Sequence, residues 1–240
     1  TMSSDPLNKI DLTSIHVLDS GTNTFIIKSK YLSSENQDRV IAKMQEKLPK
    51  FNKLRVTTIG PTVGTTLLHK GIIAIILTMV MIIVYLALAF RKIPKEVNPW
   101  RFGVTAIIAL VHDIVIVTGI FAMLGYFFNV EIDALFITAM LTVLGYSVHD
   151  TIVVFDRLRD NLLHHKESLE KTANDSLNQT LARSINTSVS VALALVAVLI
   201  FGSKAIFYFV LALTLGITVG TYSSIFVATP LLVYWNNRKK

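Results

Sequence analysis

Long apolar runs separated by short polar segments make up most of residues 69–235, whereas residues 1–68 are mostly polar. Each apolar run exceeds the roughly 18–20 residues that an α-helix needs to cross a hydrocarbon core. The sequence therefore predicts an α-helical integral membrane protein, with a transmembrane domain at residues 66–240. Its five membrane-spanning helices are expected at about residues 69–90, 102–127, 132–155, 182–202 and 205–235.

The polar residues 1–65 predict a small α/β domain, half of a ferredoxin-like unit. Alternation of apolar and polar residues favours strands, and a 3.6-residue repeat favours a helix. Strands are expected at 12–18, 23–30 and 53–59, and a helix at 34–48. So small a unit has few core residues, so we expect it to depend on a partner or a further segment.

Charge predicts the orientation in the membrane. Four basic residues lie in residues 91–101, five in 156–183 and three in the tail, whereas the opposite loops hold only Lys204. The positive-inside rule then places the C-terminus in the cytoplasm and residues 1–65 outside it. The net charge of +7 is accordingly interpreted as contact with anionic lipid headgroups, not with nucleic acid.

The composition also limits the chemistry. The chain has no cysteine, which excludes disulfides, thiol catalysis and thiolate metal sites. Residues 1–20 lack the apolar core of a signal peptide. An outer domain without an export signal, followed by five spans, predicts one further helix upstream of this sequence.

Ionisable residues interrupt the predicted spans. His112 and Asp113 lie in the second, His149 and Asp150 in the third, and Arg183 begins the fourth. A charge facing lipid at a helix centre costs at least about 2.5–3.5 kcal/mol, so these residues should face one another or a wet cavity. The two histidines are possible accessory groups, either shuttling protons or forming neutral hydrogen bonds.

Polar side chains recur at helical spacing beside these charges. Thr142 and His149 share one face of the third span, and Arg183 and Thr187 share one face of the fourth. If both faces turn inward, Asp150 and Arg183 form an ion pair whose separation changes the protonation of Asp150. A proton relay needs such an acid, although a static pair that only holds the bundle together remains the alternative.

The last span carries a small residue at every fourth position, a pattern that lets helix backbones approach closely. We expect helix packing along this seam, whose central members are Gly216, Gly220 and Ser224.

Four motifs are similar to a known family. Residues 144–161 (LGYSVHDTIVVFDRLRDN) resemble the signature of SecF, a subunit of the bacterial SecD–SecF export complex in the RND superfamily. Residues 59–64 (IGPTVG), 109–113 (ALVHD) and 179–184 (QTLARS, followed by Thr187 and Ser188) resemble its other helix motifs. The resemblance covers about residues 55–235 and departs from the family at His149, where Asn is usual.

This resemblance implies six transmembrane helices in an RND-like bundle, with an extracytoplasmic domain between the first and second. It implies a non-enzymatic subunit of the bacterial inner (plasma) membrane that pairs with SecD and assists a translocating polypeptide at the SecYEG channel. The energy would come from the proton gradient, or from sodium in some relatives, with no bound cofactor or metal. The family's coupling acid and arginine correspond to Asp150 and Arg183, and its third-helix motif to Asp113.

Two other functions share parts of this pattern. An RND-type transporter of lipids or small molecules would use the same proton chemistry, but about 65 outer residues are few for a deep substrate pocket. An intramembrane aspartyl protease would use two aspartates such as Asp113 and Asp150, but its Gly-x-Gly-Asp motif is missing. Arg183 would also oppose the shared proton of such a dyad.

Overall fold

The computed structural model describes residues 16–19, 24–29, 31–48, 52–58, 61–90, 98–164 and 167–238. The chain divides into two compact units. The first comprises Thr1–His69 together with Ser203–Ala205, and the second comprises Lys70–Gly202 and Ile206–Lys240.

The first unit contains an antiparallel hairpin and one helix. Strand β1 (His16–Asp19) pairs with β2 (Phe25–Lys28), with Val17 opposite Ile27. Residues 12–15 and the expected turn lie outside the described residues. Helix α1 (Ser34–Lys47) half-buries one face through its apolar side chains, which are Val40, Ile41 and Met44.

The strand predicted at 53–59 is wrong over its described part, because residues 53–58 have no regular secondary structure. Leu54 is 78% exposed, so the alternating pattern buries no apolar face. Instead this segment contacts α1 through one hydrogen bond, in which Gln37 Nε2 donates to Thr58 Oγ1 at 2.7 Å. A β-prone segment forms a strand only where a sheet edge is open to it, and none of the described strands pairs with this one.

Five helical segments of the described chain are long and apolar enough to cross a membrane, which confirms the five predicted spans. The first four are α2 (Pro61–Ala89), α3 (Pro99–Phe128), α4 (Ala134–His164) and α5 (Leu169–Phe201). The fifth follows a 3₁₀ turn, η2 (Lys204–Ile206), and comprises α6 (Phe207–Ser223), the π-helical turn η3 (Ser224–Ala228) and α7 (Thr229–Asn237).

Helices α4 and α5 run well beyond the predicted ends, because a helix need not stop where its apolar run stops. The Ser168 side chain caps α5 by accepting from the Lys171 amide at 3.4 Å. Asn161 of α4 donates to Ser176 Oγ of α5 at 2.9 Å, which joins the two polar extensions. The hydrophobic pattern therefore marks the bilayer part of these helices and not their full length.

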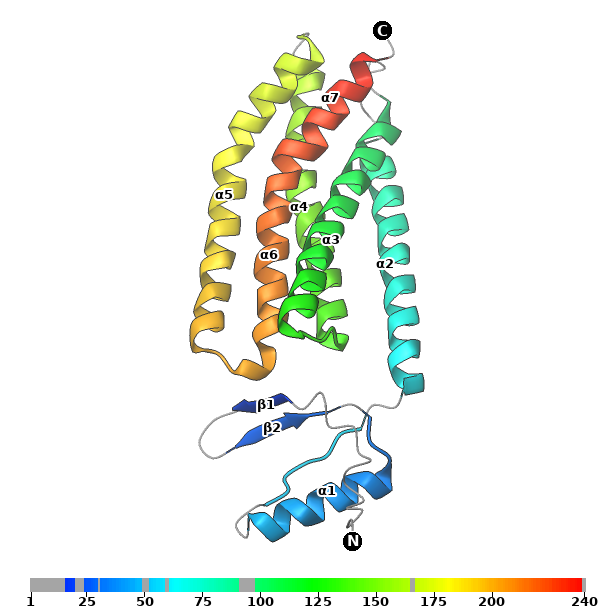
Figure 1. Ribbon diagram of the computed structural model, residues 1–240. Helices are drawn as coiled ribbons and strands as arrows, with labels where there is room; N and C mark the ends of the chain where they lie inside the picture. Colours follow the sequence, from blue (N-terminus) through cyan, green and yellow to red (C-terminus); the bar gives the residue numbers. More distant parts are fainter. Residues whose placement is uncertain are drawn as a thin grey trace. The chain divides into compact units, whose positions relative to one another are not determined.

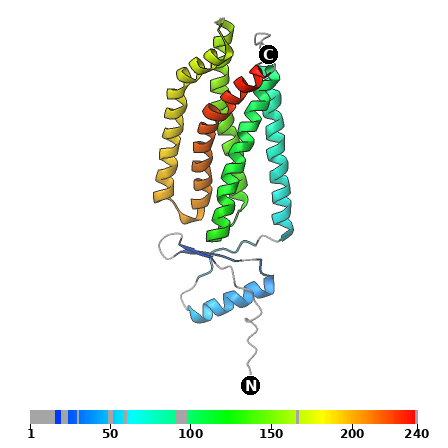
Figure 2. The same cartoon turned by 45° about the horizontal axis from the view of Figure 1, so that its top comes forward.

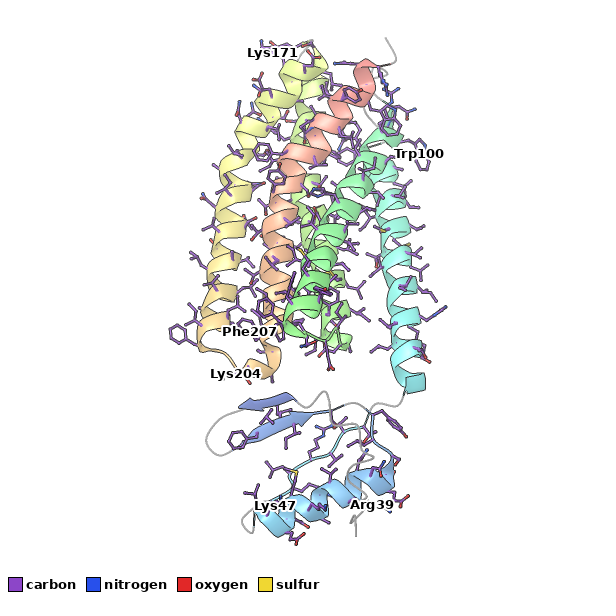
Figure 3. The ribbon with its side chains drawn as sticks, in the orientation of Figure 1. Arg39, Lys47, Trp100, Lys171, Lys204 and Phe207 are labelled. Carbon is purple, nitrogen blue, oxygen red and sulfur yellow. The ribbon has the colours of Figure 1, made fainter. Side chains whose placement is uncertain are left out.

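Helix α6 lies at the centre of the bundle and packs against α3, α4 and α5 (Figure 1). Helix α2 is at the outer edge in both views (Figures 1 and 2) and reaches the core through Leu86 and Phe90. Only 6% of its most apolar stretch is buried, against 44% for α4. Trp100 and Lys171 lie at one end of the bundle and Phe207 at the other (Figure 3).

Two apolar clusters fill the two ends of the bundle. The cluster at the end of Trp100 is built around three contacting aromatic rings, Phe90, Phe102 and Phe155, with centroids 5.1–6.3 Å apart. The cluster at the other end contains Phe121 and Phe136, whose centroids are 4.7 Å apart. Along α3, α4 and α6, the residues between these clusters are polar, and they form the candidate site.

Candidate functional site in the middle of the bundle

A layer of carboxylates and hydroxyls crosses the bundle between the two apolar clusters, and we call it the polar layer. Its members come from four helices: Asp113 of α3, Ser147, Asp150 and Thr151 of α4, Ser188 of α5, and Thr221, Ser223 and Ser224 of α6. Polar groups at membrane depth are costly unless they bond to one another, which explains why they gather here.

Asp113 is fully buried and accepts two short hydrogen bonds on the same oxygen. Ser147 Oγ donates to its Oδ2 at 2.6 Å, and Ser223 Oγ donates to it at 2.9 Å. The other oxygen, Oδ1, lies 3.1 Å from Nδ1 of His112, whose side chain is 31% exposed. The carboxylate thus connects α4 and α6 to a histidine at the edge of α3.

Asp150 is 3% exposed and is held by a second set of hydroxyls. Ser188 Oγ donates to its Oδ2 at 3.3 Å, and Thr221 Oγ1 lies 3.1 Å from the same oxygen. Thr221 and Ser188 are also 2.6 Å apart, and the Tyr146 hydroxyl lies 3.4 Å from Ser188 Oγ. Asp150 therefore sits in a small network of hydroxyls from α4, α5 and α6.

Helix α6 contacts both carboxylates, because Thr221 reaches Asp150 and Ser223 reaches Asp113. Close packing makes this reach possible. A Cβ on Gly220 would lie 2.8 Å from Ser147 Cβ, and one on Gly216 would lie 2.2 Å from Val143 Cγ2. The polar layer ends at Ser224, where the α-helix becomes the π-turn η3, a feature frequent at functional sites.

Asp150 and Arg183 form no ion pair in the structure. Arg183 is exposed, and its guanidinium has no hydrogen bond or ion pair with any residue that the structure describes. It lines a cavity of about 890 Å³ at the end of the bundle where Trp100 lies. The sequence predicted a direct pair, and the structure instead gives Asp150 two hydroxyl partners.

The polar faces predicted to turn inward are exposed. Thr142 and His149 of α4, and Thr187 of α5, all lie on the surface of this chain. The Thr142 and Thr187 hydroxyls donate to carbonyls of their own helices at 2.9 Å. The prediction was wrong by about one helical residue, because the inward faces of α4 and α5 are the neighbouring ones.

Sequence reasoning missed most hydroxyls of the polar layer. On α5 the buried face repeats a small polar residue every fourth position, from Ser176 through Thr180 and Ser184 to Ser188. That repeat was the available signal, but Arg183 drew attention to the adjacent face. Ser184 Oγ is buried and has no partner in the described part of the chain, so it is a place where a water could bind beside Ser188.

Comparison with known proteins identifies the family. The family model described as "Protein export membrane protein SecD/SecF, C-terminal" matches residues 39–238. The chain belongs to this SecD/SecF family. A SecF translocase subunit of Thermobaculum terrenum is 52% identical over 81% of this chain and 61% of its own length. The SecF subunit of Anaerolinea thermophila is 38% identical over 96% of this chain and 75% of its own length.

Relatives in which SecD and SecF are named together also match. The SecDF translocase subunit of Thermus thermophilus is 36% identical over 95% of this chain and 30% of its own length. A crystal structure of SecDF in a "super-membrane-facing form" superposes with a TM-score of 0.69, at 34% identity, over 91% of this chain and 29% of that one. The chain thus spans about three fifths to three quarters of the SecF relatives and under a third of SecDF.

Proposed function

We propose that this chain acts as a SecF-type subunit that uses the proton gradient to assist protein export across a bacterial plasma membrane. The observation that carries the proposal is the polar layer, where Asp113 and Asp150 are buried in membrane-spanning helices with hydroxyl partners. Family membership supplies the export role, and two buried carboxylates supply groups that can bind and release a proton. In this proposal the C-terminus is cytoplasmic and residues 1–65 are extracytoplasmic.

In this mechanism Asp150 is the coupling acid. When Asp150 is ionised it accepts hydrogen bonds from Ser188 and Thr221, and when it gains a proton it must donate one instead. Such a change alters which hydroxyls of α5 and α6 it can hold. Because α6 also contacts Asp113 through Ser223, a shift of α6 at Asp150 is felt at the second carboxylate.

Arg183 takes part as a charge that approaches Asp150 in another conformation of the bundle. It is free of described partners here, and it lies on the same helix as Ser188, five residues earlier, about 7.5 Å along the axis. An arginine that comes close to Asp150 favours the ionised acid, and one that withdraws favours the protonated acid. Repeated over a cycle, that exchange converts proton binding into helix movement.

A SecD-type subunit is the proposed partner within the membrane. The exposed polar residues of α4 and α5, among them Thr142, His149 and Thr187, are poorly suited to lipid and require a polar cover or a wet cavity. The Thermus relative carries both names in one chain, which supports such a pairing. The assembled pair would then act at the SecYEG channel on a translocating polypeptide.

The test measures translocation of a secretory protein into inner-membrane vesicles that contain the full-length subunit and its SecD partner. One charge moving through 100 mV contributes about 2.3 kcal/mol, so Asp150→Asn should remove up to about fiftyfold of gradient-driven stimulation. Arg183→Met should give a similar loss. The matched controls are Asp156→Asn and Lys171→Met, which change exposed charges at the end of the bundle.

Insertion and partner binding are followed in parallel by protease protection and copurification. Normal gradient-driven export in Asp150→Asn would show that the polar layer is not the coupling site. Export that is unchanged while lipid or drug efflux is lost would instead favour the transporter function.

A further inference from the structure

The cavity beside Arg183 lies between the ends of α2, α4 and α5 and has a volume of about 890 Å³. That volume is at the upper end of ligand pockets, which span roughly 300–1,000 Å³. Its lining changes character along the helices. Tyr85, Ala89 and Val153 form an apolar wall, and charged residues of α4 and α5 surround the outer part.

The charged part of the cavity has an uncompensated positive charge. Arg157 donates to Asp160 at 3.1 Å, and Arg159 lies 3.6 Å from Asp156, so two arginines are balanced by two carboxylates. Arg183 is the third arginine of the lining and has no ion pair among the residues the structure covers. The cavity therefore offers one net positive charge to a ligand.

A second observation also indicates a missing acceptor. Arg159 Nε is buried, and within the described ranges no acceptor lies within hydrogen-bond distance of it. Buried donors are nearly always bonded to protein or to an ordered ligand or water. An oxygen atom placed in the cavity between Arg159 and Arg183 would satisfy this donor and the free charge together.

We propose that this cavity binds an acidic glycerophospholipid, with its phosphate on Arg159 and Arg183 and an acyl chain along Tyr85, Ala89 and Val153. The cavity lies at the end of the bundle with Trp100 and Lys171, where headgroups meet the hydrocarbon core. Basic pockets between transmembrane helices are suited to anionic headgroups. The apolar wall beside the arginines distinguishes a lipid from a free anion, which would gain nothing from it.

The experiment is native mass spectrometry of the purified full chain in detergent, titrated with dioleoylphosphatidylglycerol or with dioleoylphosphatidylcholine, which has the same acyl chains. One arginine near a headgroup contributes a factor of about five in affinity, so two should favour the acidic lipid roughly 25-fold. Arg159→Gln should reduce that preference about fivefold. Val153→Trp should fill the apolar wall and weaken both lipids. Lys171→Gln, an exposed charge outside the cavity, should leave the preference unchanged.

Inorganic phosphate at millimolar concentration is the competitor that separates a lipid site from an anion site. Failure of phosphate to displace the lipid supports the proposal. Equal binding of both lipids, full displacement by phosphate, or a preference unchanged in both Arg159→Gln and Val153→Trp would each overturn it. Circular dichroism confirms that the variants fold. Because the assay needs neither SecD nor a proton gradient, its outcome is independent of the proposed export function.

Discussion

The middle of the bundle and its Trp100 end are built from the same helices but with opposite kinds of side chain. At that end Phe90, Phe102 and Phe155 fill space, and their contacts are non-directional beyond the preference of aromatic rings for offset or edge-on packing. In the middle, Asp113 and Asp150 are held by hydrogen bonds that depend on distance and angle.

This difference separates stability from switching. An apolar cluster loses energy in proportion to the contacts removed and has one arrangement. A carboxylate among hydroxyls has two arrangements, one for each protonation state, because the direction of its hydrogen bonds reverses. We therefore expect substitutions at the aromatic end to lower stability, and substitutions in the polar layer to lower the response to the proton gradient.

The largest effect on stability is expected from Phe155→Ala. This ring is fully buried and contacts both Phe90 and Phe102, so its removal should lower the free energy of unfolding by about 3–5 kcal/mol. Unfolding in mixed micelles measures the loss, with Phe128→Ala, a 70% exposed ring, as the control. The separation fails if folded Phe155→Ala loses its gradient response while its stability is unchanged.

Gly216→Ala should come next, with a loss of about 1–3 kcal/mol. Its Cβ would lie 2.2 Å from Val143 Cγ2, so α4 and α6 must move apart. The control is Gly145→Ala, where nothing lies within 4 Å and where alanine favours the helix. The same micelle assay compares them, and Val143→Ala should partly rescue Gly216→Ala. Equal effects of the two alanines would mean that α4 and α6 are not in close contact.

Thr221→Val tests the polar layer at nearly constant volume. It removes the α6 hydroxyl from Asp150 and from Ser188, which should cost about 1–2 kcal/mol and markedly reduce gradient-driven translocation. Thr218→Val is the matched control, because Thr218 is exposed and bonds only the Thr214 carbonyl of its own helix. A full gradient response in Thr221→Val would show that α6 does not sense Asp150.

The smallest effect is expected from His149→Asn. His149 is exposed although it precedes Asp150, so stability of the isolated chain should change by less than about 0.5 kcal/mol. Binding to a SecD-type partner is the sharper measurement, since the proposed interface covers this face. A large loss of stability in the isolated chain would mean that His149 belongs to the polar layer after all.

The sequence by itself determined the five spans, the basic ends and the motifs that indicate the SecD/SecF family, because each depends on local composition and order. It also identified Asp113 and Asp150 as the acids inside the spans, since a carboxylate in an apolar run is visible without a fold. It could not fix helix ends such as His164, since polar helix continues outside the bilayer.

Only the tertiary structure decided how α4 and α5 are rotated. Each helix carries two polar faces one residue, or about 100°, apart: Arg183 and Thr187 against Ser184 and Ser188 on α5. Periodicity alone fits both faces equally well. Packing against α6 selects the one with small side chains, because Gly216 and Gly220 bring the backbones too close for an arginine to lie between them.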